Sequence, residues 1–270
     1  SVQGSGSVSG QSGYYLEGTV IELTALPSDA WMFSGWTGDA TGSENPVQVL
    51  VDGEISITAV FTELWDTETA VVDVINPSTG KTWMDRNLGA SRVATSYSDT
   101  ESRGDLYQWG RAKDGHQKRN SPTTTILSTS DQPGHGKYII AESLGSSFDW
   151  RNPSNDTLWQ GVDGINNPCP LGYRVPTYQE WQQERASWSS FNRAGAYGSP
   201  LKLPAAGYRT SEGFVSQTNA EGHYWSSSIA GATDDYSGFL IFSYQTSAIT
   251  VDERIHGRSV RCIKDEPEEP

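Results

Sequence analysis

Residues 167–181 read NPCPLGYRVPTYQEW, and this stretch combines a turn, a cysteine and the start of a helix. The segment from Thr177 to Glu180 is a capping box, because the threonine hydroxyl can accept the N3 amide while the glutamate returns to the cap's own amide. Trp181 and Trp188 follow on one side of the same segment, seven residues apart. The stretch therefore predicts a turn, then an amphipathic helix with tryptophans on its inner face.

The cysteine in this turn, Cys169, has one possible partner, because the chain contains two cysteines. The other, Cys262, ends an apolar alternation, SVRCI, at residues 259–263. Neither has a CxxC neighbour or a clustered histidine, which argues against a zinc site or a redox motif. A turn cysteine and a last-strand cysteine predict a disulfide that closes a second, C-terminal domain of the chain. Such a bridge implies an oxidising compartment.

Upstream, the first sixty residues consist of short apolar alternations separated by Gly, Pro, Asn or Asp. This pattern predicts a small antiparallel sheet. The pair Asp52 and Gly53 stands between two alternating runs and predicts a hairpin.

Composition sets wider limits on the 270 residues. Helix formers are scarce while Gly, Ser, Thr, Trp and Tyr are abundant, so we expect a mostly β (α+β) chain with few helices and long ordered loops. The net charge of −14 and the absence of a Lys/Arg cluster exclude a duplex-binding face. The chain contains no run of eighteen apolar residues, which is the length that a membrane-spanning helix needs. Since Ser1 is not an initiator methionine, we expect a mature or excised piece.

Four motifs in the N-terminal segment suggest a family. They are GTVIELTALP (18–27), FSGWTGD (33–39), NPVQV (45–49) and SITAVF (56–61). The segment 1–62 resembles the divergent internalin-type B repeat of bacterial surface proteins. The resemblance implies a stalk or spacer module without a ligand site of its own, and residues 63–69 are expected to be a linker.

Six further motifs follow in order between residues 82 and 263. They are TWMDRNLGASR, GDLYQWGRAKDG, NPCPLGYRVPTYQEW, LKLPAAGYR, GHYWSSS and GRSVRCI. They resemble the Fibrobacter succinogenes major paralogous domain. The resemblance implies a C-type-lectin-like fold over residues 70–265, followed by an acidic tail at 266–270. That fold is similar to formylglycine-generating enzyme and to the variable proteins of diversity-generating retroelements.

Catalysis is not expected. The chain has no GxSxG, no HExxH and no phosphate-binding glycine loop. The oxidase activity of formylglycine-generating enzyme needs an active-site cysteine pair, whereas both cysteines here are expected in a structural bridge. A carboxylate dyad in a deep cleft stays open as a rival hypothesis, since so acidic a chain always offers pairs.

No cofactor is expected, with a structural calcium ion as the alternative. Asx side chains gather in one loop-rich stretch, and oxygen ligands of this kind suit calcium. They also serve turns for local reasons. The residues concerned are Asp149, Asn152, Asn155, Asp156, Asp163, Asn166 and Asn167. The motif tryptophans Trp83, Trp109, Trp181 and Trp225 are expected to be core rather than a sugar platform.

The segment 207–261 is expected to carry the ligand surface. In residues 238–244, period-two geometry places Leu240 and Phe242 on one face and Phe239, Ile241 and Ser243 on the other. Both faces are apolar, so a strand buried on both sides is one explanation. The alternative, which we adopt as the hypothesis, is that the odd-numbered side chains face solvent. Under it, Phe239, Ile241, Tyr244, His223 and Ile255 form one partly exposed surface.

This arrangement resembles the variable region of a retroelement-diversified protein, in which a fixed frame holds scattered, freely substituted positions. The resemblance implies the following ligand-binding residues: Thr210, Ser211, Glu212, Phe214, His223, Ile229, Thr233, Asp234, Asp235, Phe239, Ile241, Ser243, Tyr244, Thr246, Asp252, Glu253, Ile255 and His256.

These observations predict a non-catalytic extracellular binding protein, an adhesin-like tip at the bacterial cell surface. Its expected partner is an extracellular protein or glycan, with no nucleic acid and no membrane insertion, and the chain is expected to belong to a larger surface protein or assembly. The alternative is a carbohydrate-binding accessory module of a polysaccharide-degrading enzyme.

Overall fold

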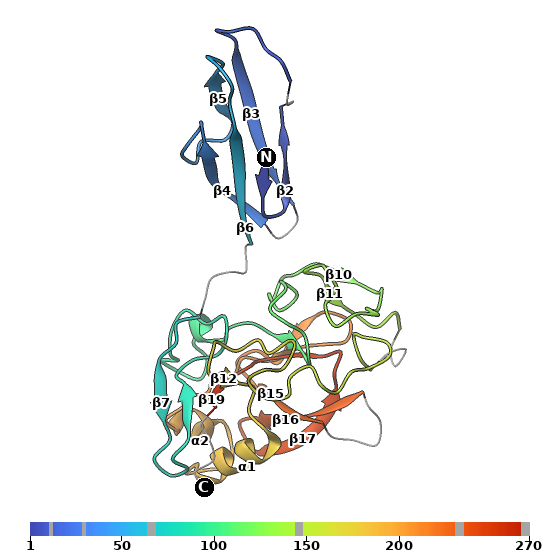
Figure 1. Ribbon diagram of the computed structural model, residues 1–270. Coiled ribbons are helices and arrows are strands. Elements are labelled where there is room, and N and C mark those ends of the chain that lie inside the picture. Colours follow the sequence, from blue (N-terminus) through green and yellow to red (C-terminus); the bar gives the residue numbers. More distant parts are fainter. Residues whose placement is uncertain (11–12, 29–30, 64–68, 144–147, 230–234, 266–270) are drawn as a thin grey trace. The chain divides into compact units, whose positions relative to one another are not determined.

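The structure, a computed structural model, describes residues 1–10, 13–28, 31–63, 69–143, 148–229 and 235–265. The chain divides into two compact units, Ser1–Thr67 and Glu68–Pro270 (Figure 1). In both units strands outnumber helical segments and form several small sheets, and this confirms the mostly β class. Within the described ranges no helix is both long and apolar enough to cross a bilayer.

Unit 1 consists of two three-stranded sheets, with orders β1-β6-β4 and β2-β3-β5. Their strands are β1 (Val2–Gln3), β2 (Gly6–Ser9), β3 (Val20–Pro27), β4 (Trp31–Gly38), β5 (Val47–Leu50) and β6 (Ile57–Glu63). The core includes side chains from both sheets, among them Leu23, Trp36 and Phe61, so it lies between them. The alternation predicted for this segment buries one face of each sheet.

The hairpin predicted at Asp52 and Gly53 is wrong. Strand β5, which precedes this pair, binds β3, while β6, which follows it, binds β1 and β4. The connection therefore carries the chain from one sheet to the other. The local turn signal is real, but partners distant in sequence decide which strands pair.

The described residues of unit 2 form four small sheets, of which one joins the two ends of the unit. In this sheet the order is β12-β19-β8-β7, so a late strand inserts between early ones. The strands are β7 (Asp73–Ile75), β8 (Thr82–Met84), β12 (Tyr173–Arg174) and β19 (Ile263–Lys264). The terminal strand thereby holds the start of the unit in place.

Unit 2 contains two further small sheets. One has the order β14-β13-β18-β9 and the other pairs β10 with β11. Their strands are β9 (Tyr107–Gln108), β10 (Thr123–Thr124), β11 (Tyr138–Ile139), β13 (Tyr208–Arg209), β14 (Val215–Ser216) and β18 (Gly257–Arg258). All six are two residues long, so loops with internal hydrogen bonds carry most of this region.

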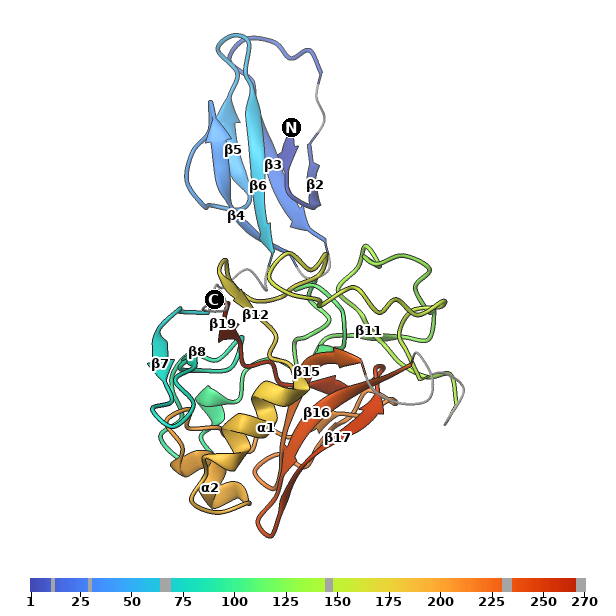
Figure 2. The ribbon, with the colours of Figure 1, turned by 60° about the horizontal axis from the view of Figure 1, so that its bottom comes forward.

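The largest sheet of unit 2 is β15-β16-β17, formed by β15 (Gly222–Ile229), β16 (Tyr236–Phe242) and β17 (Ser247–Glu253). Helix α1 (Tyr178–Ala186) packs against it (Figure 2). A second helix, α2 (Arg193–Gly198), and a 3-10 turn, η1 (Thr100–Ser102), lie in the connections.

Helix α1 begins as the sequence predicts. Thr177 is its N-cap, and both hydrogen bonds of the capping box with Glu180 are present. Trp181 is fully buried and donates its indole N–H to the carbonyl oxygen of Trp225 on β15. The motif tryptophans Trp83 and Trp109 are buried as well, and so is Trp225. All four are core, as predicted.

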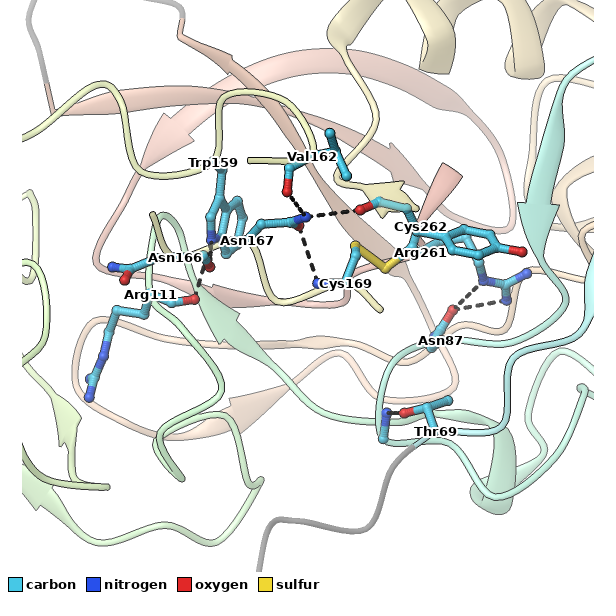
Figure 3. The surroundings of a disulfide bond; sticks show 12 residues. Thr69, Asn87, Arg111, Trp159, Val162, Asn166, Asn167, Cys169, Arg261 and Cys262 are labelled. Atoms are coloured by element: carbon cyan, nitrogen blue, oxygen red, sulfur yellow. Dashed lines mark hydrogen bonds between the residues drawn. A yellow bond between two sulfur atoms is a disulfide. The ribbon is translucent and has the colours of Figure 1, made fainter. Parts of the chain in front are cut away.

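The predicted disulfide between Cys169 and Cys262 is present, with 5.9 Å between the two Cα atoms (Figure 3). Asn167 shapes the turn, because its side-chain oxygen accepts the amide of Cys169 and its amide group donates to the Val162 carbonyl. The carbonyl oxygen of Cys262 accepts the amide of Met84 on β8. The bridge therefore fastens the turn before α1 to the sheet that joins the ends of unit 2.

Replacing both cysteines by serine should lower the free energy of unfolding of unit 2. The bridge closes a loop of 93 residues, for which the chain-entropy model gives about 4–5 kcal/mol. Urea unfolding of the wild type and the Cys169→Ser/Cys262→Ser variant measures the difference. Equal free energies of unfolding would show that the bridge contributes nothing to the fold.

Candidate ligand-binding surface

The sheet β15-β16-β17 has two faces of different character. Toward α1 it presents Tyr224, Leu240 and Phe242, which are buried in one core. On the opposite face, strand pairing aligns Trp225 with Phe239 and Thr250, and aligns His223 with Ile241 and Ala248. Two rows of side chains therefore cross this second face from β15 to β17.

Phe239, in the middle of the first row, is buried, with 4% of its surface exposed. The guanidinium of Arg258 lies over its ring at 3.8 Å from the centroid, and over the Trp225 ring at 4.6 Å. The His223 ring stacks beside it at 5.7 Å, with 7° between the planes. Arg258 of β18 thus covers the centre of this face, where Phe239 lies beside His223 and Trp225 of β15.

The charge of Arg258 is balanced by Asp252 on β17, to which it donates a hydrogen bond. Burial lowers the pKa of Arg258. Burial also favours the neutral form of Asp252, but His256, whose Nδ1 lies 3.4 Å from a carboxylate oxygen, and the charge of Arg258 hold the pKa of that carboxyl well below its usual range. Both groups stay ionised at neutral pH, and each depends on the other.

Both ring nitrogens of His223 also have partners within the protein. Its Nε2 lies 2.9 Å from a carboxylate oxygen of Glu221, and its Nδ1 lies 3.4 Å from an Arg258 nitrogen. The Tyr208 ring packs on it at 4.5 Å. Burial lowers the pKa of His223 to about 4, so the imidazole is neutral at pH 7. In that state Nε2–H donates to Glu221 while Nδ1 accepts from Arg258.

The exposed surface predicted for five residues is partly wrong. Tyr244 is exposed and Ile241 is partly exposed, as expected, but His223, Phe239 and Ile255 are buried. The cause is the cover from a distant segment: Arg258 closes over Phe239, while His223 lies between Tyr208 and Phe239. Ile255 is 0% exposed in the turn before β18. The alternative, a strand buried on both sides, describes Phe239 correctly.

The remaining predicted residues divide by exposure. Glu212, Phe214, Ile229 and Thr246 are exposed; Thr210, Asp235, Ser243, Asp252, Glu253 and His256 are partly exposed; and Ser211 is buried. Thr233 and Asp234 lie outside the described residues. No observation tests ligand contact for any of them, so for the accessible residues that assignment stays a prediction.

The accessible residues form separate groups along the sheet rather than one continuous set. Ile241 lies in the middle of the face, while Ser243, Tyr244 and Thr246 belong to the turn between β16 and β17. Ile229 ends β15, at the other end of the sheet. Glu212 lies between β13 and β14, and the charge of His256 contributes to lowering the pKa of its carboxyl.

Two residues that sequence reasoning missed complete the middle of the face. Ala248 and Thr250 on β17 are exposed and aligned with Ile241 and Phe239. Their register follows from the turn at residues 243–246, which pairs Phe242 with Ser247. Applying period-two geometry to β17 as well as β16 would have placed them on this face.

The Asx-rich stretch has structural partners. Asp156 lies 2.6 Å from a guanidinium nitrogen of Arg254, and Asp149 lies 3.8 Å from another. Asn166 and Asn167 donate to backbone carbonyls. Among the residues that the structure describes, no three His, Cys, Asp or Glu side chains converge in a way that could hold a metal ion.

Comparison with known proteins gives a family match for unit 1. Residues 1–64 match the family model of the divergent InlB B-repeat domain, in agreement with the four motifs of this segment. No curated protein and no solved structure gave a significant match to the chain. A repeat of this type and an intramolecular disulfide are together features of an extracellular protein.

The two aligned residues Phe239 and Thr250 give a matched test of the face. Phe239→Ala should cost about 3–5 kcal/mol, because it opens a cavity beneath Arg258. Thr250→Ala, directly opposite in the register, should cost less than about 1 kcal/mol, since only an exposed strand preference is lost. Chemical denaturation of both variants measures the contrast. Equal costs would mean that Phe239 is not covered.

Proposed function

We propose that unit 2 is a non-catalytic, C-type-lectin-like binding domain that recognises an extracellular protein or glycan through the accessible residues on the second face of the sheet β15-β16-β17. In this proposal unit 1 is a spacer, and the chain is the adhesin-like tip of a larger bacterial surface protein. The tip resembles the variable proteins that retroelements diversify.

One observation carries the proposal: the residues that hold this face together are different from the residues that a ligand can reach. Arg258, Asp252 and His223 satisfy one another beneath or beside the sheet. Ala248 and Thr250 extend outward from a strand whose pairing does not depend on their side chains. Substitutions at exposed positions of this kind cost a fold little, which suits a surface whose contacts differ from one variant to the next.

The partners of the charged groups support a role without catalysis. Asp252 is held ionised by His256 and Arg258, and the neutral His223 is bound at both nitrogens. A general base needs a lone pair directed at substrate, whereas both nitrogens of His223 are engaged and Asp252 is the counter-ion of Arg258. Joining the unit's ends in one sheet, and fastening the turn before α1 to that sheet by a disulfide, gives the rigid frame that loop-rich binding domains need.

The exposed aromatic residues Phe214 and Tyr244 favour a second candidate, a carbohydrate-binding accessory module of a polysaccharide-degrading enzyme. The DNA beside the gene separates the two. A reverse transcriptase gene and a near-identical repeat of the 3′ coding segment would favour the adhesin. A neighbouring glycoside hydrolase gene would favour the module.

The ligand face can be tested by blocking it. Ala248→Arg/Thr250→Arg should keep the melting temperature of the wild type but lose at least about tenfold in affinity, because long charged side chains would cover the face. Binding is measured on an array of immobilised glycans and extracellular proteins, with the wild type defining the ligand. Gln48→Arg, at an exposed position on β5 of unit 1, is the matched control and should bind normally.

Two results would contradict the proposal. A folded double variant that still binds every ligand of the wild type would remove the face from recognition. Loss of binding in the Gln48→Arg control would mean that the spacer itself contributes to the site.

A further inference from the structure

The turn end of the sheet β15-β16-β17 carries arginines whose partners are not carboxylates. Arg193 donates to the backbone carbonyl of Asn219 at 2.7 Å, and Arg103 donates to the side-chain oxygen of the same residue at 2.8 Å. Two guanidinium groups therefore converge on one neutral residue. Arg185, Arg209 and Arg261 also have neutral hydrogen-bond partners, so what distinguishes this place is that two guanidinium groups meet at one residue.

A third arginine adds to this charge. Arg119 donates to the carbonyls of Gly104 and Ala206. Burial, and then the positive charge of Arg103, lower the pKa of Arg119 to about 10. The nearby carboxylate of Asp105, which counteracts this shift, forms its own ion pair with Lys118.

Ion-paired arginines occur in other parts of the described chain. They are Arg86, Arg92, Arg111, Arg151, Arg174, Arg254 and Arg258. Within the described residues, neither Arg103 nor Arg193 forms such a pair. Positive charge at Asn219 is thus left for an external anion to balance.

Aromatic rings pack on one of these cations, Arg193. The Arg193 guanidinium lies 3.7 Å from the centroid of the Tyr97 ring and 5.8 Å from that of Tyr244. Tyr97 is 39% exposed and Tyr244 is 74% exposed. The Arg193 amide also donates to the carbonyl of Ser243, which fastens the start of α2 to the turn between β16 and β17 (Figure 2).

This geometry leaves both a charge and a ring available. Arg193 uses one nitrogen for Asn219, and among the described residues its other N–H groups have no hydrogen-bond acceptor. A guanidinium binds a carboxylate with two parallel hydrogen bonds. An exposed tyrosine ring offers an apolar face with a polar tip, against which the C–H face of a pyranose can pack.

We propose that Arg193, Arg103, Tyr97 and Tyr244 form a site for an anionic glycan, a pyranose that carries a carboxylate. The carboxylate pairs with the guanidinium groups at Asn219, and the sugar ring packs on Tyr244. An acidic peptide would satisfy the arginines but would leave the exposed ring without a partner. This inference rests on the proposed binding function and assigns a chemical class to its ligand.

The test measures binding of a galacturonate oligomer to the full chain by calorimetry. A neutral galactose oligomer and a polyglutamate peptide are the comparison ligands. Arg193→Gln and Tyr244→Ala should each weaken galacturonate binding at least about tenfold. Lys264→Gln, which removes the same charge from β19, should leave it unchanged. Binding should also weaken as salt rises from about 50 to 300 mM, because exposed charges are screened.

Several results would overturn the inference. They are absence of galacturonate binding to the wild type, equal affinity of Arg193→Gln, and equal binding of polyglutamate, which would remove the sugar from the assignment. Melting curves show whether each variant is folded, and Arg193→Lys, which keeps the charge but not the planar fork, should bind more weakly than wild type. If Ala248→Arg/Thr250→Arg abolishes binding of another ligand that Arg193→Gln retains, the proposed function stands and this inference fails.

Discussion

The buried guanidinium of Arg258 determines how the sheet β15-β16-β17 is built. It lies between the rings of Phe239 and Trp225 on one side and the carboxylate of Asp252 on the other. A charge in the interior costs several kcal/mol unless a partner of opposite sign meets it with good geometry. The position of β17, which supplies Asp252, is therefore coupled to that of β18, which supplies the arginine.

This coupling decides which side chains a ligand can reach. Phe239 and His223 are covered because Arg258 needs a flat, polarisable surface and a neutral neighbour. Ala248 and Thr250, beyond the reach of that cover, stay accessible. At the turn end of the sheet, the Arg193 guanidinium has, among the residues that the structure describes, rings and a backbone carbonyl as its partners. At the centre of the sheet the charge of Arg258 is therefore balanced by Asp252, whereas at the turn end the charge of Arg193 is not balanced by a carboxylate of the described residues.

The sequence predicted features that depend on a local pattern or on a single possible pairing. The capping box at Thr177, the bridge between Cys169 and Cys262 and the buried tryptophans were all found. Alternation also identified which residues of β16 share a face, but it could not tell which face is solvent. That depends on Arg258, which reaches the sheet from another strand. The turn signal at Asp52 failed for the same reason, because pairing with β3 and β4 overrides it. Placing Ala248 and Thr250 on this face requires the alternation of side chains along β17 as well as along β16.

A double-mutant cycle on Asp252 and Arg258 tests the central claim most directly. Asp252→Asn alone should cost about 3–5 kcal/mol in free energy of unfolding, since it leaves a buried charge without its partner. Arg258→Met/Asp252→Asn should recover much of that loss, because the interior charge and its partner disappear together. The account predicts a coupling energy of several kcal/mol. Costs that add within about 0.5 kcal/mol would contradict it, and would mean that the arginine does not set the form of this face.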